Sequence, residues 1–531
     1  MPEGMRWDYI IVGAGSAGCA LAWQLAHQAR EPKILVIEAG ASDRSPYIRV
    51  PLGQIRAITR YDWGYRSEPD PSRRGTSEAW LRGKVLGGSS SINGMLYVKG
   101  AASDFDRWAE LCGTSGGWSS AQVLPIFREL ECSDRPGRGR DGRMYVRTVR
   151  YPHSITDAFI QAAGTRGYLF NEDYNGQGQE GVGYAQLSQR GGLRCSAADA
   201  FLKPLVNQKK VTLLTNAVVE RVEFANGHAT GVVFTREGNK CRESARQIVL
   251  CAGTIGSPQI LMLSGVGDPE ELARHNIPVV LSLPGVGRNL AEHPLLRLMY
   301  RTTVPTYNVT AGMLQQLKFA AMYLWHRAGP LANPFEAIAF LRSSLMQPHP
   351  DIQLHFLPLG YLTHPDGSVE LASVPSVTVL LNKSHPISRG RIRLASARAT
   401  DAPLIECRLL EDDSDLDTLV QGVRVVRAIM EAKPIARWIE QEVSPGRGLD
   451  DPSALRDYIR RHTTIAAHPV GTCRMGKDVQ AVVDPDLRVH GTQNLWVADA
   501  SVMPDLISGN TNAVCMMIGA KLGKSLAARA A

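Results

Sequence analysis

The sequence predicts an α/β protein of two domains, one with the strand–helix–strand order of a βαβ fold and one built on an antiparallel β-sheet. Near the start, two short apolar runs, residues 8–12 and 33–38, flank a glycine cluster and a helical pattern. Further along, apolar runs at residues 351–359, 375–383 and 389–396 follow one another without an intervening helix. The first arrangement is typical of a parallel sheet and the second of an antiparallel one, so the chain combines two architectures.

Other elements follow from the same signals. Residues 105–131 have the apolar spacing of a helix, and residues 211–224 and 229–235 form a hairpin pattern that turns at Asn226-Gly227. Residues 247–252 are a further buried-strand pattern. We expect the chain to end in a helix that begins at about Ala513, after a glycine-rich stretch.

Composition favours a globular protein. The 531 residues are 44% hydrophobic and 21% charged, and a length prior of about 150 residues per domain predicts two to four domains. The formal net charge is +8, but the Arg cluster at 135, 138, 140 and 143 alternates with Gly, Pro and Asp, which is typical of a solvated loop. We therefore expect no nucleic-acid partner, while a weak attraction to anionic membranes stays open.

The chain has nine cysteines, which is an odd number. They form no C-x-x-C pair, and several lie within apolar runs. This pattern indicates buried, reduced thiols rather than disulfides or a metal site. The first residues lack a signal-peptide pattern, and no apolar stretch reaches the 18 residues of a membrane-spanning helix. Together these features predict a cytoplasmic protein without a transmembrane segment.

The glycine cluster is a G-x-G-x-x-G motif at Gly13, Gly15 and Gly18, between the first apolar run and the helical pattern. In a dinucleotide site the first glycine permits a tight turn, the second lets backbone approach a pyrophosphate, and the third lets the helix pack on the strand. Glu38 ends the second run, where an acidic residue can accept hydrogen bonds from a ribose. A glycine-rich turn in another α/β protein is the alternative, and the motif does not separate FAD from NAD.

Five longer segments resemble, in content and in order, the glucose–methanol–choline (GMC) oxidoreductase family. The first family signature is similar to GKVLGGSSSINGMLYVKGAASDFD at residues 83–106, and the second to GTIGSPQILMLSGVG at 253–267. The likeness continues in PGVGRNLAEHP (284–294), HPVGTCRMG (468–476) and LWVADASVMPDLISGNTNAVCMMIGAK (495–521). Residues 296–450 are the part least like the family.

The resemblance implies an FAD-binding domain of Rossmann type that is discontinuous in sequence. It would comprise residues 1–152, 194–295 and 465–531. A substrate-binding domain on the antiparallel sheet would comprise residues 153–193 and 296–464. The active site would lie between the two domains, beside the flavin ring.

The motif and the resemblance together imply a set of cofactor-binding residues. They are Gly13, Gly15, Ser16, Ala17, Gly18, Glu38, Ala39, Val85, Gly87, Gly88, Asn93, Gly94, Met95, Leu96, Val218, Ala252, Gly253, Asp499, Ala500, Asn512 and Ala513. Some family members link the flavin covalently to a His in the loop that follows Gly88. The matching residue here is Ile92, which cannot form that bond, so we expect the FAD to be bound non-covalently.

The resemblance also implies a catalytic pair. His468 opens the segment in which family members carry a catalytic His, and a histidine of suitable pKa can act as the base that takes a hydroxyl proton. We expect its partner to be Asn512, although Asn512 and Asn510 are also both candidate helix caps. We interpret His293 as structural, and we do not expect Cys473 to act as a nucleophile, because hydride transfer requires none.

The predicted reaction is oxidation of a primary alcohol to an aldehyde by hydride transfer to flavin N5, with O₂ or a quinone as the final electron acceptor. The alternatives are a hydroxynitrile lyase that keeps FAD and a flavin-binding protein without redox activity. An apolar segment could line the substrate pocket or belong to the core; it includes Met313, Phe319, Met322, Tyr323, Leu324 and Trp325. The sequence predicts neither the particular alcohol nor the oligomeric state.

Overall fold

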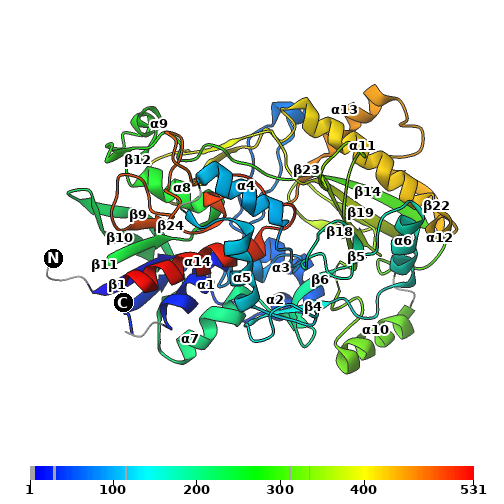
Figure 1. Cartoon of the computed structure of the whole chain (residues 1–531), viewed down its shortest axis with the longest axis horizontal. Coiled ribbons are helices and arrows are strands. Elements are labelled where there is room, and N and C mark those ends of the chain that lie inside the picture. Colours follow the sequence, from blue (N-terminus) through cyan, green and yellow to red (C-terminus); the bar gives the residue numbers. More distant parts are fainter. Residues whose placement is uncertain (1–5, 28–30, 114–115, 310–311, 334, 531) are drawn as a thin grey trace.

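The computed structural model describes residues 6–27, 31–113, 116–309, 312–333 and 335–530. Two seven-stranded sheets organise them, one toward each end of the long axis (Figure 1). No helix in these ranges is long and apolar enough to cross a membrane. The nine cysteines are free thiols.

The first sheet has the order β8-β2-β1-β11-β10-β9, with β24 beside β11. Its strands are β1 (Trp7–Val12), β2 (Ile34–Ile37), β8 (Thr212–Leu214), β9 (Ala217–Ala225), β10 (His228–Arg236), β11 (Asn239–Leu250) and β24 (Leu495–Val497). The pairs among β8, β2, β1, β11 and β24 are parallel, whereas β9 and β10 form the predicted antiparallel hairpin. Helix α1 (Ser16–Leu25) packs along α14 (Asn512–Ala530), so the two ends of the chain meet beside this sheet (Figure 1).

The second sheet is antiparallel throughout, as the run of apolar segments predicted. It has the order β22-β14-β19-β16-β15-β5, with β23 beside β14. The strands are β5 (Gly181–Tyr184), β14 (Pro294–Thr302), β15 (Ala337–Leu341), β16 (Ile352–Leu357), β19 (Ser376–Lys383), β22 (Ile439–Ser444) and β23 (Thr464–Ile465). One face packs against α6 (Ser154–Thr165), α11 (Asp413–Met430), α12 (Lys433–Ala436) and α13 (Pro452–His462).

The alternating directions of the side chains along β16 show what lies against the other face of this sheet. Successive side chains of a strand point to opposite faces. Ile352, Leu354 and Phe356 belong to the core under the helices, whereas His355 and Leu357 line a cavity on the opposite side. The sheet therefore presents one of its faces to the site described below.

The remaining elements connect and cover the two sheets. The helices are α2 (Pro46–Arg49), η1 (Pro51–Gly53), α3 (Gln54–Arg60), η2 (Pro71–Arg73), η3 (Gly88–Ser91), α4 (Ala102–Cys112), α5 (Ser120–Leu130), η5 (Ala198–Leu202), α7 (Lys203–Asn207), α8 (Gly253–Leu263), α9 (Pro269–Arg274), α10 (Gly312–His326) and η6 (Ala500–Val502). The small sheets contain β3 (Glu131–Ser133), β4 (Met144–Thr148), β6 (Gln186–Arg190), β7 (Leu193–Arg194), β12 (Val266–Gly267), β13 (Leu281–Ser282), β17 (Tyr361–Thr363), β18 (Val369–Leu371), β20 (Arg391–Arg393) and β21 (Leu404–Glu406).

Two expectations differ from the structure. The helical pattern at residues 105–131 is two helices, α4 and α5, and the second begins with a capping box between Ser119 and Gln122. The run at 389–396 contains β20, which pairs with β21 and not with the substrate sheet, and Ile392 of β20 is buried in the same core as the nucleotide sheet. Strand β6, which falls within the expected substrate segment 153–193, pairs with β4 of the expected FAD-binding segment 1–152.

The apolar segment that could line a pocket is helix α10, at the edge of the molecule (Figure 1). Tyr323 is buried and its hydroxyl donates to the carbonyl of Gly192, but Leu324 and Trp325 are exposed. The side chain of Met313 lies outside the described part of the chain. No described side chain of α10 is among those that line the cavity, so the described part of this segment does not form the pocket wall.

Candidate active site

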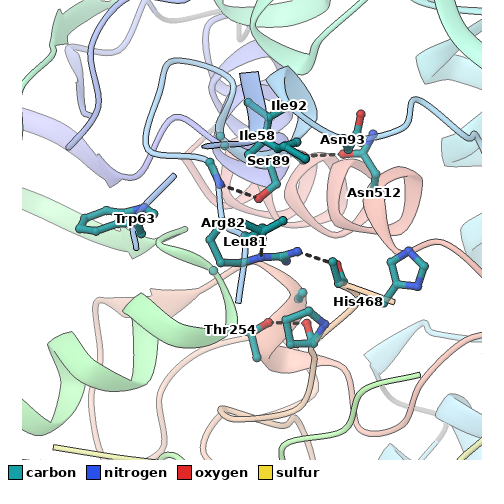
Figure 2. Close-up of a pocket in the computed structure, with 18 of the residues that line it drawn as sticks. Ile58, Trp63, Leu81, Arg82, Ser89, Ile92, Asn93, Thr254, His468 and Asn512 are labelled. Carbon is teal, nitrogen blue, oxygen red and sulfur yellow. Dashed lines mark hydrogen bonds between the residues drawn. The ribbon is translucent and has the colours of Figure 1, made fainter. Parts of the chain in front are cut away.

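A cavity of about 520 Å³ lies between the carboxyl ends of the parallel strands and the open face of the antiparallel sheet. Its walls come from segments far apart in sequence and include the glycine motif. Figure 2 shows four others: the loop around Ser89, the start of α8 at Thr254, the segment at His468 and the start of α14 at Asn512. The carboxyl edge of a parallel sheet is where doubly wound folds bind their ligands. Most of the predicted cofactor residues line this cavity: Gly13, Gly15, Ser16, Ala17, Glu38, Ala39, Gly88, Asn93, Gly94, Met95, Leu96, Val218, Ala252, Gly253, Asp499, Ala500 and Asn512.

The three glycines of the first motif meet different surroundings. A Cβ on Gly13, whose φ is +102°, would lie 2.4 Å from the carbonyl oxygen of Cys251. A Cβ on Gly18 would lie 2.0 Å from the carbonyl oxygen of Gly13, because α1 packs closely on the turn. A Cβ on Gly15 would meet no protein atom within 4 Å. Gly13 and Gly18 are thus needed by the fold, whereas Gly15 keeps space free for a ligand.

The second loop comes directly against the first. A Cβ on Gly88 would lie 2.9 Å from the Cα of Gly15, so the two loops touch at the point where the cavity opens. Gly87 has φ +88° and, like the buried Val85, supports this loop without lining the cavity. Ala513, buried in α14, is likewise behind the wall, as is Gly18.

Two buried carboxylates mark the nucleotide end of the cavity. Glu38 accepts hydrogen bonds from the backbone N–H groups of Ala14 and Gly40, both at 2.8 Å, and burial raises its pKa to about 7. Asp499 accepts from the N–H of Gly253 at 2.9 Å and from the hydroxyl of Ser257 at 2.6 Å. Burial also raises the pKa of Asp499. Both carboxylates are therefore held rigidly beside the space that Gly15 leaves open.

These features fit an extended dinucleotide such as FAD. The free space at Gly15 accommodates a pyrophosphate, Glu38 is placed for a ribose, and the cavity continues to His468 with room for a ring system. Ile92 is buried in the wall, and its hydrocarbon side chain has no atom that can bond to a flavin.

His468 lies at the far end of the cavity (Figure 2). Its Nε2 atom is 2.9 Å from the Nδ2 of Asn510, and its Nδ1 atom is 3.1 Å from the Nδ1 of His293. Burial lowers the pKa of His468 well below its usual value, and the neighbouring His293, His355 and Arg82 lower it further. The imidazole is therefore neutral at pH 7 and can accept a proton.

The backbone at both histidines is held by one buried acid. Glu292 accepts the N–H of His468 with both carboxylate oxygens at 2.8 Å, and the N–H of His293 at 2.8 Å. Burial raises the pKa of Glu292 to about 8, although these bonds and the charge of Arg82 act in the opposite direction. Arg82 itself donates to the carbonyl of Ala467 at 2.6 Å and so holds the residue before His468 (Figure 2).

The expected partner of His468 has to be corrected. The side chain of Asn510, not that of Asn512, contacts His468. Asn512 accepts a hydrogen bond from the hydroxyl of Ser16 at 2.6 Å and thereby joins the start of α14 to the first glycine loop. Because α14 begins at Asn512, Asn510 precedes the helix and is directed by the loop before it. Asn512 belongs to the cofactor end of the cavity and Asn510 to the histidine end.

Two further residues at this end were not predicted. His355 is buried on β16, lines the cavity and has both ring nitrogens without a hydrogen-bond partner among the described residues. Gln353, two positions earlier on the same face, donates from Nε2 to the Oδ1 of Asn510 at 3.1 Å. The alternation in DIQLHFLPL could have found both, because it places Gln353 and His355 on one face.

Comparison with known proteins agrees with this geometry. Residues 7–295 and 386–519 match the N-terminal and C-terminal regions of the GMC oxidoreductase family. The chain is 37% identical to an alcohol dehydrogenase (acceptor) from Pseudomonas putida, over 96% of the chain and 94% of that protein. It is 38% identical to an oxygen-dependent choline dehydrogenase from Rhizobium etli, over 99% and 97% of the two chains.

A solved structure gives the same result. That of pyridoxine 4-oxidase from Mesorbium loti superposes with a TM-score of 0.89 at 30% identity, covering 98% of this chain and 99% of that one. Together, the paired glycine loops, the cavity that they open and these similarities over almost the whole sequence lead to one conclusion: the chain belongs to the GMC oxidoreductase family.

Proposed function

We propose that the protein oxidises a primary alcohol to the aldehyde, with His468 as the base that accepts the hydroxyl proton. The observation that carries this proposal is the position of His468 Nε2, which faces the cavity beside the Asn510 amide on a ring kept neutral by burial. When bound, FAD supplies the acceptor for the hydride that leaves the carbinol carbon.

The side chains around His468 can each act on the hydroxyl group. The alcohol oxygen would donate its proton to His468 Nε2 and accept a hydrogen bond from the Asn510 amide. His355, which has unpartnered ring nitrogens and lines the same end of the cavity, can hold the same oxygen. A negative charge that develops on that oxygen would thus meet hydrogen-bond donors already in place.

The lining of this end favours an apolar alcohol. Leu295, Leu357, Leu359 and Leu380 line it, together with the aromatic rings of Phe335 and Tyr361. Among the described residues, the acidic side chains that line the cavity are Glu38 and Asp499, and both are held at the nucleotide end. At the His468 end no described carboxylate lines the cavity, and that of Glu292, which does not line it, is bonded to the backbone N–H groups of His293 and His468. A quaternary ammonium group such as that of choline would therefore meet no carboxylate in this part of the cavity, so an aliphatic or aromatic alcohol is the better fit.

Anaerobic stopped-flow spectroscopy tests this function. Wild-type holoenzyme is mixed with a panel of primary alcohols, and bleaching of the flavin is followed without oxygen or quinone. For His468→Ala, the rate of bleaching should fall by a factor of about 10² to 10⁴, the usual contribution of a positioned base. His490→Ala is the matched control, because His490 is also partly buried but bonds the Gly476 carbonyl.

The possible outcomes distinguish this proposal from the two alternatives, a hydroxynitrile lyase and a flavin-binding protein without redox activity. If His468→Ala bleaches as fast as wild type, His468 is not the base. If no alcohol bleaches the wild-type flavin and hydroxynitriles are cleaved, the protein is a lyase. A flavin-binding protein without redox activity would do neither. Exposure of the reduced enzyme to air, or to a soluble quinone, then identifies the class of acceptor.

A further inference from the structure

We propose that His293 is a positioning residue that keeps the proton of His468 on Nδ1, and so leaves Nε2 free to accept the proton of the alcohol. The inference rests on the proposed function, in which His468 is the base. A neutral imidazole carries one proton on either of its two nitrogens, and only the nitrogen without it can act as a base. The position of the proton therefore decides whether His468 is active.

The argument starts at two backbone carbonyls, which can only accept hydrogen bonds. The Nε2 atom of His293 lies 2.8 Å from the carbonyl oxygen of Ser384 and 3.1 Å from that of Ile507. His293 must therefore carry a proton on Nε2 to satisfy them. The ring is fully buried, and burial lowers its pKa to about 4, so it is neutral at pH 7.

The Nδ1 of a neutral His293 protonated on Nε2 has a lone pair and no proton. It lies 3.1 Å from the Nδ1 of His468. Two lone pairs at this distance would repel each other, whereas a proton on the Nδ1 of His468 makes a hydrogen bond to His293. The hydrogen bond between the two rings thus requires the proton of His468 to be on Nδ1. The Nε2 atom of His468, on the cavity side, then carries no proton.

A second chain of hydrogen bonds reaches His468 from the opposite side and requires the same proton position. Gln353 donates to the Oδ1 of Asn510, which turns the amide nitrogen of Asn510 toward His468. That nitrogen can only donate, and it lies 2.9 Å from the Nε2 of His468. Nε2 must then be the acceptor. The two sets of hydrogen bonds require the same proton position, although one starts at the carbonyls of Ser384 and Ile507 and the other at Gln353 of β16.

The other groups around His293 and His468 do not change this proton position. The carboxylate of Glu292 is bonded to the backbone N–H groups of both histidines. Arg82 donates from its side chain to the carbonyls of Leu81 and Ala467. The ring of His355 also faces this end, and burial lowers its pKa to about 4, so it is a neutral neighbour. Among the described residues, the group that contacts Nδ1 of His468 is the ring of His293.

Nitrogen NMR of the holoenzyme reads the proton position directly. The protein is labelled with ¹⁵N in its histidine rings, and the signals of His468 are identified by their loss in His468→Gln. At neutral pH and with the flavin oxidised, His468 should show a protonated Nδ1 and an unprotonated Nε2. A proton on Nε2 would overturn the inference, whatever the kinetics of any variant.

Two variants test the role of His293 in the reaction. His293→Leu keeps most of the volume but removes the acceptor, so flavin reduction should slow by a factor of up to about 10⁴, the loss seen when a catalytic histidine adopts the wrong tautomer. His293→Asn offers an amide oxygen as the acceptor and should recover at least tenfold of this loss. The dissociation constant of the alcohol should stay within about threefold in both, because the binding groups remain.

His490→Leu serves as the control for a purely structural effect, since it also removes a histidine that bonds a backbone carbonyl. It should change melting temperature without changing the rate of flavin reduction. A His293→Leu protein that holds FAD and is reduced within threefold of wild type would refute the inference. Full activity of His468→Ala would instead refute the proposed function, so the two failures are distinct.

Discussion

Asn510 and Asn512 are two residues apart, yet their replacement by Ala should affect different steps. Asn510→Ala removes the amide that lies 2.9 Å from His468 and that can donate to the alcohol oxygen. A hydrogen bond to an oxygen that gains negative charge contributes about 1.5 to 3 kcal/mol. The rate of flavin reduction should therefore fall by a factor of about 10 to 150.

Asn512→Ala removes the neutral hydrogen bond from Ser16 to Asn512 at the cofactor end. Such a bond contributes about 0.5 to 1.5 kcal/mol, so the affinity for FAD should fall by a factor of about 2 to 12. At saturating FAD the rate of reduction should equal that of wild type. The effects should be smaller than that of His468→Ala, because both variants keep the base.

Stopped-flow reduction and FAD titration of the apoprotein measure the two quantities separately. The refuting result is a reversal, in which Asn512→Ala slows reduction at saturating FAD and Asn510→Ala does not. That result would restore the assignment made from the sequence. Equal losses of rate in both variants would show that the two side chains share one function, against the separation of their contacts in the structure.

Three further predictions follow from the cavity. Gly15→Val should keep the fold but lose FAD, because its side chain would occupy only the space left free for the ligand. The control Gly164→Val, at an equally open position on α6, should keep FAD. Normal flavin absorbance in Gly15→Val would refute the assignment of this loop to the pyrophosphate. Acid precipitation should release all the flavin into the supernatant, since Ile92 cannot bond to it, and flavin that stays in the pellet would contradict this. The rate of flavin reduction should be flat above about pH 6.5 and fall only in more acidic solution, because the lowered pKa of His468 delays its protonation; a rate that rises through pH 7 to 8 would disagree.

The sequence predicted those parts of the fold in which a local pattern determines the structure. The strand–glycine–helix–strand unit and the hairpin at Asn226-Gly227 are examples, because each depends on residues close to one another. The partner of a strand is not a local property. The pattern at residues 389–396 contains a strand, but only the tertiary structure shows that β20 pairs with β21 beside the nucleotide core.

The same difference between local patterns and tertiary contacts applies to the site. The glycine motif fixes its own backbone, so Gly13, Gly15 and Gly18 could be placed from their spacing. Asn510 could not be distinguished from Asn512, because the direction of a side chain just before a helix depends on the loop that holds it. The local sequence of His293 indicates only a structural role, because nothing in it shows that its ring contacts the ring of His468, 175 residues away.

The junction of α1 with α14 has a consequence for how the protein is made. The first glycine loop is synthesised well before the segment at His468, strand β24 and the start of α14, which complete the same site. Domains generally fold during synthesis as they emerge, yet the nucleotide sheet lacks strand β24 and the helix that packs along α1 until β24 and α14 have been synthesised. We therefore expect flavin to bind only after these segments have been synthesised, and a chain that stops shortly before His468 should neither close the cofactor site nor contain the proposed base.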